Sequence, residues 1–257
     1  MKKINKSVSF ILGFIILFTL YHGAENMILF RNSPVGFLIF HGFFIMAAWS
    51  IARYQFGEGL KAWGFLITRR IFIQVIAGII LGNLIYWLSF FLSLWFGFEQ
   101  ILAIPSLKDY IQILGMFVFG NFFSSFSEDV LTRGYVYKHL QNRIKPALII
   151  LISALIYVFN HIYRLTDGPE TYLYLFLLGV LFLIPLVKTQ QLWTTGAVHW
   201  GYNCTFYFTH EVIRVKTASA VFGANYLLSI VLIVFIIILW IIPVKFYRAF
   251  LISKSQT

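Results

Sequence analysis

Residues 71–96 read IFIQVIAGIILGNLIYWLSFFLSLWF, an apolar run that contains no charged side chain. Such a run is typical of a transmembrane helix, because about 20 apolar residues are needed to cross the hydrocarbon core of a bilayer. The whole chain has the same character, since 60% of its 257 residues are hydrophobic and only 11% are charged. This composition excludes an ordinary soluble domain and indicates a polytopic membrane protein.

Similar apolar runs recur along the chain and predict an all-α, polytopic membrane helical bundle with about eight transmembrane helices. We expect one integral membrane domain over residues 1–257, because no repeat, low-complexity tract or domain boundary interrupts the pattern. The more polar segment 61–70 is expected to lie on the membrane surface. The predicted spans are residues 8–21, 35–54, 71–96, 110–128, 146–163, 172–187, 192–209 and 226–244.

The net charge of +11 is distributed unevenly over the connections between these spans. By the positive-inside rule, this distribution places both termini in the cytoplasm of a multi-pass cell-membrane protein. A basic inner face suits the anionic headgroups of a lipid bilayer, so we expect a bilayer and no nucleic acid as partner. The inner connections hold Lys2, Lys3, Lys6, Arg53, Lys61, Arg69, Arg70, Lys138, Arg143, Lys145, Lys188, Lys245, Arg248 and Lys254, whereas the outer ones hold Arg31, Lys108, Arg164, Arg214 and Lys216.

Three small groups of polar residues interrupt the apolar spans. An ionisable side chain inside a membrane costs several kilocalories per mole, so each such group is a candidate functional site. The groups are Glu128, Asp129 and Arg133; Tyr157 and His161; and His199 and Asn203.

In the first group, Asp129 and Arg133 are four residues apart. Residues with this spacing share a helix face, so these two side chains can neutralise each other. Glu128 is rotated by about 100° from Asp129 and stays available as a general base. Alternatively, Glu128 and Asp129 only mark a helix end at the membrane surface, with Ser127 as its cap.

In the third group, His199 and Asn203 are also four residues apart, and we expect both to project toward a common point. Tyr157 precedes His161 by one turn, where it could line a cavity or orient the imidazole ring. A single buried histidine is more often an ordinary core residue than a catalyst. The combination of all three groups in one chain favours a functional site.

The three groups resemble the motifs of the CPBP (CAAX protease and bacteriocin-processing, also called Abi) family. The run EDVLTRG at 128–134 resembles the first motif, E-E-x-x-x-R, and YVFNH at 157–161 resembles F-x-x-x-H. The run HWGYN at 199–203 is similar to H-x-x-x-N, and the resemblance covers about residues 110–208, the predicted protease core. Asp129 stands where a second glutamate is usual, and Tyr157 where phenylalanine is usual.

The resemblance implies an intramembrane endopeptidase that hydrolyses a membrane-associated or lipidated peptide or protein. Glu128 and His161 would activate a water molecule, His199 and Asn203 would stabilise the oxyanion, and Asp129, Arg133 and Tyr157 would support them. We expect no obligatory cofactor. Zinc is the alternative, because two histidines and one carboxylate with an open water position make a catalytic zinc centre, although the sequence has no H-E-x-x-H motif.

Two alternatives from other functional classes stay open at this point. The first is a non-catalytic bacteriocin-immunity or peptide-binding membrane protein with the same fold. The second is a transporter in which Glu128, Asp129 and the histidines form a proton or metal path. A transporter would be expected to spread polar residues across both leaflets, whereas here they cluster in three segments.

Overall fold

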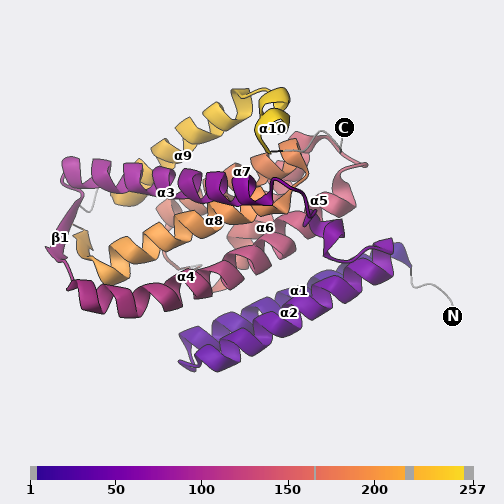
Figure 1. Ribbon diagram of the computed structural model, residues 1–257, viewed down its shortest axis with the longest axis horizontal. Helices are drawn as coiled ribbons and strands as arrows, with labels where there is room; N and C mark the ends of the chain where they lie inside the picture. The colour runs from indigo at the N-terminus through magenta and orange to yellow at the C-terminus, as the bar shows by residue number, and fades with distance from the viewer. Residues whose placement is uncertain (1–4, 165, 218–222, 252–257) are drawn as a thin grey trace.

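The computed structural model describes residues 5–164, 166–217 and 223–251, which form an elongated helical bundle (Figure 1). The predicted all-α fold class is confirmed. The helices are α1 (Lys6–Leu29), α2 (Pro34–Phe56), α3 (Ile71–Trp95), α4 (Leu107–Asp129), α5 (Tyr135–Leu140), α6 (Pro146–Asn160), α7 (Pro169–Thr189), α8 (Leu192–Tyr207), α9 (Ala224–Ile241) and α10 (Val244–Leu251). Short 3-10 helices cover Leu60–Trp63 and Ile162–Arg164, and π turns cover Val130–Gly134 and Phe208–Val212.

Each predicted span coincides with one helix of the bundle. Among the described residues, five helices are long and apolar enough to cross a membrane: α1, α2, α3, α7 and α9. Helix α6 is apolar but shorter. Helices α4 and α8 carry the motif residues and are less apolar. A total of eight membrane crossings therefore stays a prediction.

Helix ends follow the local sequence. The hydroxyl of Ser33 accepts a hydrogen bond from the Gly36 amide at 3.1 Å, and Pro34 occupies the first turn of α2. These are the residues preferred at a helix start. Helix α2 ends at Gly57, whose φ of 73° lies in the left-handed region that glycine adopts without strain.

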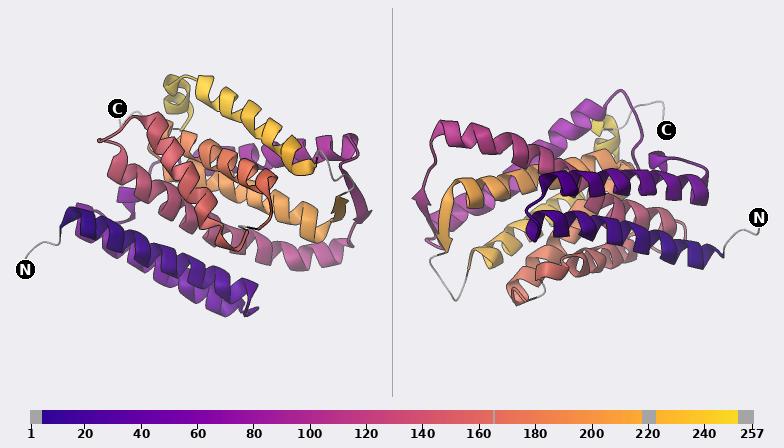
Figure 2. Two further views of the ribbon diagram at one scale, coloured as in Figure 1. Left: turned by 180° about the vertical axis from the view of Figure 1, so that it is seen from behind. Right: turned by 90° about the horizontal axis from the view of Figure 1, so that it is seen from below.

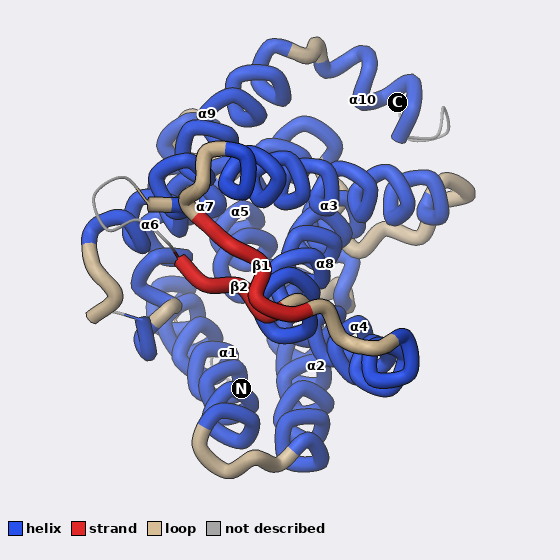
Figure 3. Tube along the Cα trace, turned by 90° about the vertical axis from the view of Figure 1, so that its left-hand side faces the viewer, coloured by secondary structure: helices blue, strands red, loops and turns tan. Residues whose placement is uncertain are grey.

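A two-stranded sheet, which no sequence pattern predicts, closes one end of the bundle. Strand β1 (Glu99–Ala103) pairs antiparallel with β2 (Arg214–Thr217) (Figure 3). In this register Gln100 lies opposite Lys216. The strands are too short to show a periodic pattern in the sequence. Their pairing ties the α3–α4 connection to the α8–α9 connection.

Helix α8 lies inside the bundle and packs closely on α3. A Cβ on Gly82 would overlap the carbonyl oxygen of Val198, and a Cβ on Gly201 would lie 2.5 Å from the carbonyl oxygen of Ile79. Small residues allow helix backbones to approach in this way within a membrane. This close contact fixes the helix that carries His199 and Asn203.

The first part of segment 61–70, which is expected to lie on the membrane surface, is buried against the helices of the bundle, and its place relative to the membrane stays a prediction. Trp63 is 1% exposed, and its indole N–H donates to the carbonyl oxygen of Ala48 at 2.9 Å. Its ring lies 5.1 Å from the ring of Tyr135 on α5. The segment enters the bundle because an indole buries a large apolar area and finds an acceptor for its N–H.

Helices α1 and α2 form a hairpin along one flank of the bundle (Figure 2). A buried contact joins it to the motif helix α4, where His41 Nδ1 and Ser127 Oγ lie 3.0 Å apart. The outer faces of both helices carry exposed apolar side chains, such as Ile11, Ile15 and Met46. Such a face suits contact with lipid.

Candidate active site

A π turn interrupts the helix that carries the first motif. Helix α4 ends at Asp129, the π turn Val130–Gly134 follows, and α5 continues in the same direction. The hydroxyl of Thr132 donates to the Glu128 carbonyl oxygen at 2.8 Å, and Ser153 donates to the Thr132 carbonyl oxygen at 2.7 Å. Backbone groups inside a bilayer need such partners, and π turns are frequent at functional sites.

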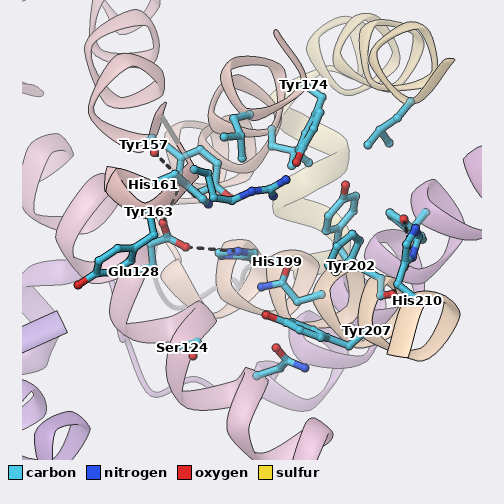
Figure 4. Close-up of a pocket in the computed structure, with 18 of the residues that line it drawn as sticks. Ser124, Glu128, Tyr157, His161, Tyr163, Tyr174, His199, Tyr202, Tyr207 and His210 are labelled. Carbon is cyan, nitrogen blue, oxygen red and sulfur yellow. Dashed lines mark hydrogen bonds and ion pairs between the residues drawn. The ribbon is translucent and has the colours of Figure 1, made fainter. Parts of the chain in front are cut away.

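The Glu128 carboxylate lies among polar groups from two other segments. One carboxylate oxygen, Oε1, accepts a hydrogen bond from Asn160 Nδ2 at 2.8 Å and lies 3.8 Å from His161 Nδ1. The other, Oε2, lies 3.7 Å from His199 Nε2. Figure 4 shows Glu128 pointing toward both histidines, which come from the end of α6 and from α8. Glu128 is only 4% exposed.

The ion pair predicted from the spacing of Asp129 and Arg133 is present. Both side chains are fully buried, and Arg133 Nη1 donates to Asp129 Oδ1. The same oxygen lies 3.3 Å from His199 Nδ1. Because an ionised carboxylate only accepts hydrogen bonds, Nδ1 of His199 carries the hydrogen and Nε2 is directed to Glu128. Asp129 therefore orients His199 as well as neutralising Arg133.

Two aromatic rings enclose the buried Arg133 guanidinium. Its central carbon lies 4.4 Å from the centre of the Tyr157 ring and 5.1 Å from that of Phe182. Aromatic faces attract a cation in this geometry. The same rings touch the histidines, since Tyr157 makes an edge contact with His161 at 4.6 Å and Phe182 stacks on His199 at 4.6 Å. Tyr157 thus lines the site and also fixes the position of His161.

His161 caps the carboxyl end of α6, which ends at Asn160, three residues before the end of the predicted span at 163. Its Nδ1 lies 2.8 Å from the Tyr157 carbonyl oxygen, one turn earlier. A carbonyl can only accept, so Nδ1 donates and the lone pair of a neutral ring is on Nε2. The imidazole is half-buried beside Glu128.

Asn203 lies one turn after His199 on α8, and both residues line the same cavity. Its Nδ2 donates to the hydroxyl of Ser125 on α4 at 3.2 Å. The amide carries a second N–H, which remains for another acceptor. His199 and Asn203 therefore face one common space, as expected from their spacing.

The cavity has a volume of about 520 Å³. Glu128, Tyr157, His161, His199 and Asn203 contribute to its wall, so the three motifs surround one space. Sequence reasoning missed Asn160, the donor to Glu128, although it stands directly before the motif histidine. It also missed the pair of Glu99 and His210 farther along the cavity, where Oε1 and Nε2 lie 3.3 Å apart. These two residues belong to no motif and are far apart in sequence.

The zinc alternative requires two histidines and one carboxylate that converge on one ion. Among the described residues, no group of three or more His, Cys, Asp or Glu side chains is arranged to hold a metal ion. The Nδ1 atoms of His161 and His199 face oxygen acceptors, which is also the arrangement of histidines that bind a metal through Nε2. The zinc alternative therefore stays a prediction, and a chelation experiment tests it.

Residues 110–205 match the family of type II CAAX prenyl endopeptidases, Rce1-like. The matched segment contains all three motifs and nearly the whole predicted core at 110–208. The predicted resemblance to the CAAX protease family is therefore confirmed, and that family consists of intramembrane proteases of the CAAX type. No curated protein matches the chain.

Proposed function

We propose that this chain is an intramembrane endopeptidase in which the Glu128 carboxylate activates a water molecule. One observation carries the proposal. Of the two adjacent carboxylates, Asp129 is neutralised by Arg133, whereas Glu128 faces a cavity between two histidines. A carboxylate that is desolvated, and not consumed by an ion pair with an arginine, suits a general base.

The reaction begins when Glu128 takes a proton from water and the oxygen attacks the carbonyl carbon of the scissile peptide bond. His161 helps to orient that water, because its Nε2 remains an acceptor while Nδ1 donates to Tyr157. A new C–O bond forms, and the carbonyl oxygen becomes an oxyanion. Glu128 then gives the proton to the leaving nitrogen, the C–N bond breaks, and a carboxylate and an amine are released.

His199 and Asn203 stabilise the oxyanion in this proposal. In this proposal Nδ1–H of His199 faces the Asp129 carboxylate, and an Nε2–H on the opposite side of the ring donates to the oxyanion. Asn203 contributes the N–H that does not bond to Ser125. Donors held in fixed positions in a water-poor site stabilise a developing negative charge strongly, by about 2.7–4 kcal/mol for one donor.

Cleavage of a hydrophobic or lipidated peptide by the purified protein in detergent tests this function. We expect His161→Ala and His199→Ala each to abolish cleavage, and Asn203→Ala to lower it by about 100-fold. An incubation with a chelator should leave the rate unchanged. Loss of activity with the chelator, restored by zinc, would instead support the metal-dependent alternative.

The non-catalytic alternative makes a different prediction in the same experiment. A peptide-binding or immunity protein would bind the peptide without cleaving it, and the His161 and His199 variants would change binding only. If wild-type protein binds the peptides tested and cleaves none of them, the protease proposal is wrong.

A further inference from the structure

The two ends of the bundle differ in charge. The start of α1 and helix α10 lie at one end, here called the basic end, and β1 lies at the other, here called the sheet end (Figure 1). The connections α2–α3, α5–α6, α7–α8 and α9–α10 all meet at the basic end. These connections and the helix ends beside them carry Arg53, Lys61, Arg69, Arg70, Lys138, Arg143, Lys145, Lys188 and Lys245, whereas Lys2, Lys3 and Lys254 lie outside the described residues.

The cavity that contains Glu128 extends to the sheet end. Its wall includes the end of α1, strand β1, the turn after α6 and the start of α9. All of these segments lie at or beside the outer connections. Leu29 and Phe30, which line it there, are 58% and 60% exposed, so the cavity reaches the surface of the molecule at this end.

Polar side chains continue from this opening toward Glu128. Glu99 and His210 form a pair in the cavity wall, and the Tyr86 hydroxyl lies 3.4 Å from His210 Nδ1. Arg164 also lines the opening, and its guanidinium lies 5.7 Å from the centre of the Tyr174 ring. A wall of this kind can exchange hydrogen bonds with a peptide backbone, which an apolar wall cannot.

Toward the basic end, buried side chains fill the space beyond Glu128. Leu131 and Tyr135, which follow Glu128 in that direction, are completely buried, and Trp63 packs against Tyr135. A second cavity of about 680 Å³ does open near Arg53 and Lys61. It reaches Ser127 on α4, whereas the Glu128 carboxylate belongs to the first cavity.

We infer that the peptide reaches Glu128 from the extracytoplasmic side of the membrane. The positive-inside rule places the basic end in the cytoplasm, so the sheet end and the cavity opening face outward. The substrate class is then a peptide, or a segment of a membrane-anchored protein, that is exposed at the outer surface. The identity of the substrate as a peptide rests on the proposed protease function. The side of the membrane from which it enters rests on the fold and on the distribution of charge.

Cysteine labelling tests the sidedness without requiring activity. Cys204 is the single cysteine of the chain, so Cys204→Ser gives a background in which one new cysteine can be labelled. Asn225→Cys places a thiol at the cavity opening, and Lys145→Cys places the matched control in an exposed connection at the basic end. For each variant, labelling after denaturation in detergent gives the maximum signal, to which the labelling in intact vesicles is normalised.

A membrane-impermeant maleimide is applied to right-side-out and to inverted membrane vesicles. Asn225→Cys should react at least tenfold faster in right-side-out vesicles, and Lys145→Cys at least tenfold faster in inverted ones. The reverse pattern, or equal labelling of Asn225→Cys in both preparations, overturns the inference.

Cleavage of an impermeant hydrophilic-tagged peptide provides the second measurement. Right-side-out vesicles should cleave it at least tenfold faster than inverted vesicles containing the same amount of protein. Faster cleavage by inverted vesicles overturns the inference and leaves the protease function intact. If neither preparation cleaves the peptide while the labelling pattern is as expected, the proposed function fails and the sidedness of the cavity stands.

Discussion

The two cavities beside α4 differ in the chemistry of their walls. The first, of about 520 Å³, contains Glu128, His161 and His199. The second, of about 680 Å³, has a mostly aromatic and aliphatic wall, with Phe44, Trp49, Phe122, Phe123, Phe126 and Trp193. The polar side chains of the wall, and not the volume, distinguish the cavity in which we propose catalysis.

Adjacent residues of α4 contribute to these different walls. Ser127 belongs to the second cavity, where its hydroxyl pairs with the completely buried His41. Glu128 belongs to the first, where its carboxylate lies beside two histidines and an amide donor. One step along a helix changes the direction of a side chain by about 100°, so one residue separates the contact with His41 from the carboxylate that we propose as the general base.

Moving the carboxylate by one residue should have the largest effect. The double variant Ser127→Glu/Glu128→Gln keeps the overall charge but directs the carboxylate to the second cavity, away from His161 and His199. Peptide cleavage should fall by a factor on the order of 10²–10⁴, the usual contribution of a general base. A double variant with more than a tenth of the wild-type rate would mean that the position of the carboxylate does not matter.

Removing the carboxylate of Asp129 should lower both stability and activity. Asp129→Asn leaves the Arg133 guanidinium buried without its counter-charge, which costs about 3–5 kcal/mol of folding free energy. It also weakens the hydrogen bond that orients His199, and a hydrogen bond to a charged group contributes about 1.5–3 kcal/mol, or about 10- to 100-fold in rate.

The double variant Asp129→Asn/Arg133→Met separates these two effects. It contains no unpaired charge, so the midpoint of thermal unfolding in detergent should recover toward that of the wild type. Cleavage should stay low, because His199 still lacks its carboxylate partner. Recovery of both properties would show that Asp129 acts only on Arg133.

Asn160→Ala should have a smaller effect. It removes the 2.8 Å hydrogen bond to Glu128 and leaves the carboxylate and both histidines in place. We expect kcat to fall about tenfold, as for one charge-assisted hydrogen bond, and KM to change less than twofold. A rise in KM at constant kcat would instead assign Asn160 to peptide binding.

A change in the wall of the second cavity should have the smallest effect. Trp49→Leu reduces a half-exposed aromatic side chain on α2 without touching the first cavity. The cleavage rate of the purified protein in detergent should stay within twofold of the wild type. A loss of tenfold or more would show that the second cavity takes part in the reaction.

The sequence was most informative for features that depend on one residue type or on one spacing between residues, such as helices and local ion pairs. Apolar runs located the helices, and the four-residue spacing of Asp129 and Arg133 correctly predicted their ion pair. The three motifs identified side chains that the fold brings to one cavity.

Contacts between distant segments were not predictable in this way. The link from Asp129 to His199 spans 70 residues and depends on how α8 packs against α4. Trp63 belongs to the segment that we expected on the membrane surface, yet its indole is buried among the helices of the bundle. Strands β1 and β2 are short, and each becomes regular only by pairing with the other.

The central claim is that the Glu128 carboxylate activates the water that cleaves the peptide. The most direct measurement compares the single-turnover rates of peptide cleavage by purified wild-type protein and by Glu128→Gln. The two proteins are first shown to have the same midpoint of thermal unfolding. The amide has the same shape but cannot take a proton from water, so we expect the rate to fall by a factor on the order of 10²–10⁴. A Glu128→Gln rate within tenfold of the wild-type rate would contradict the claim.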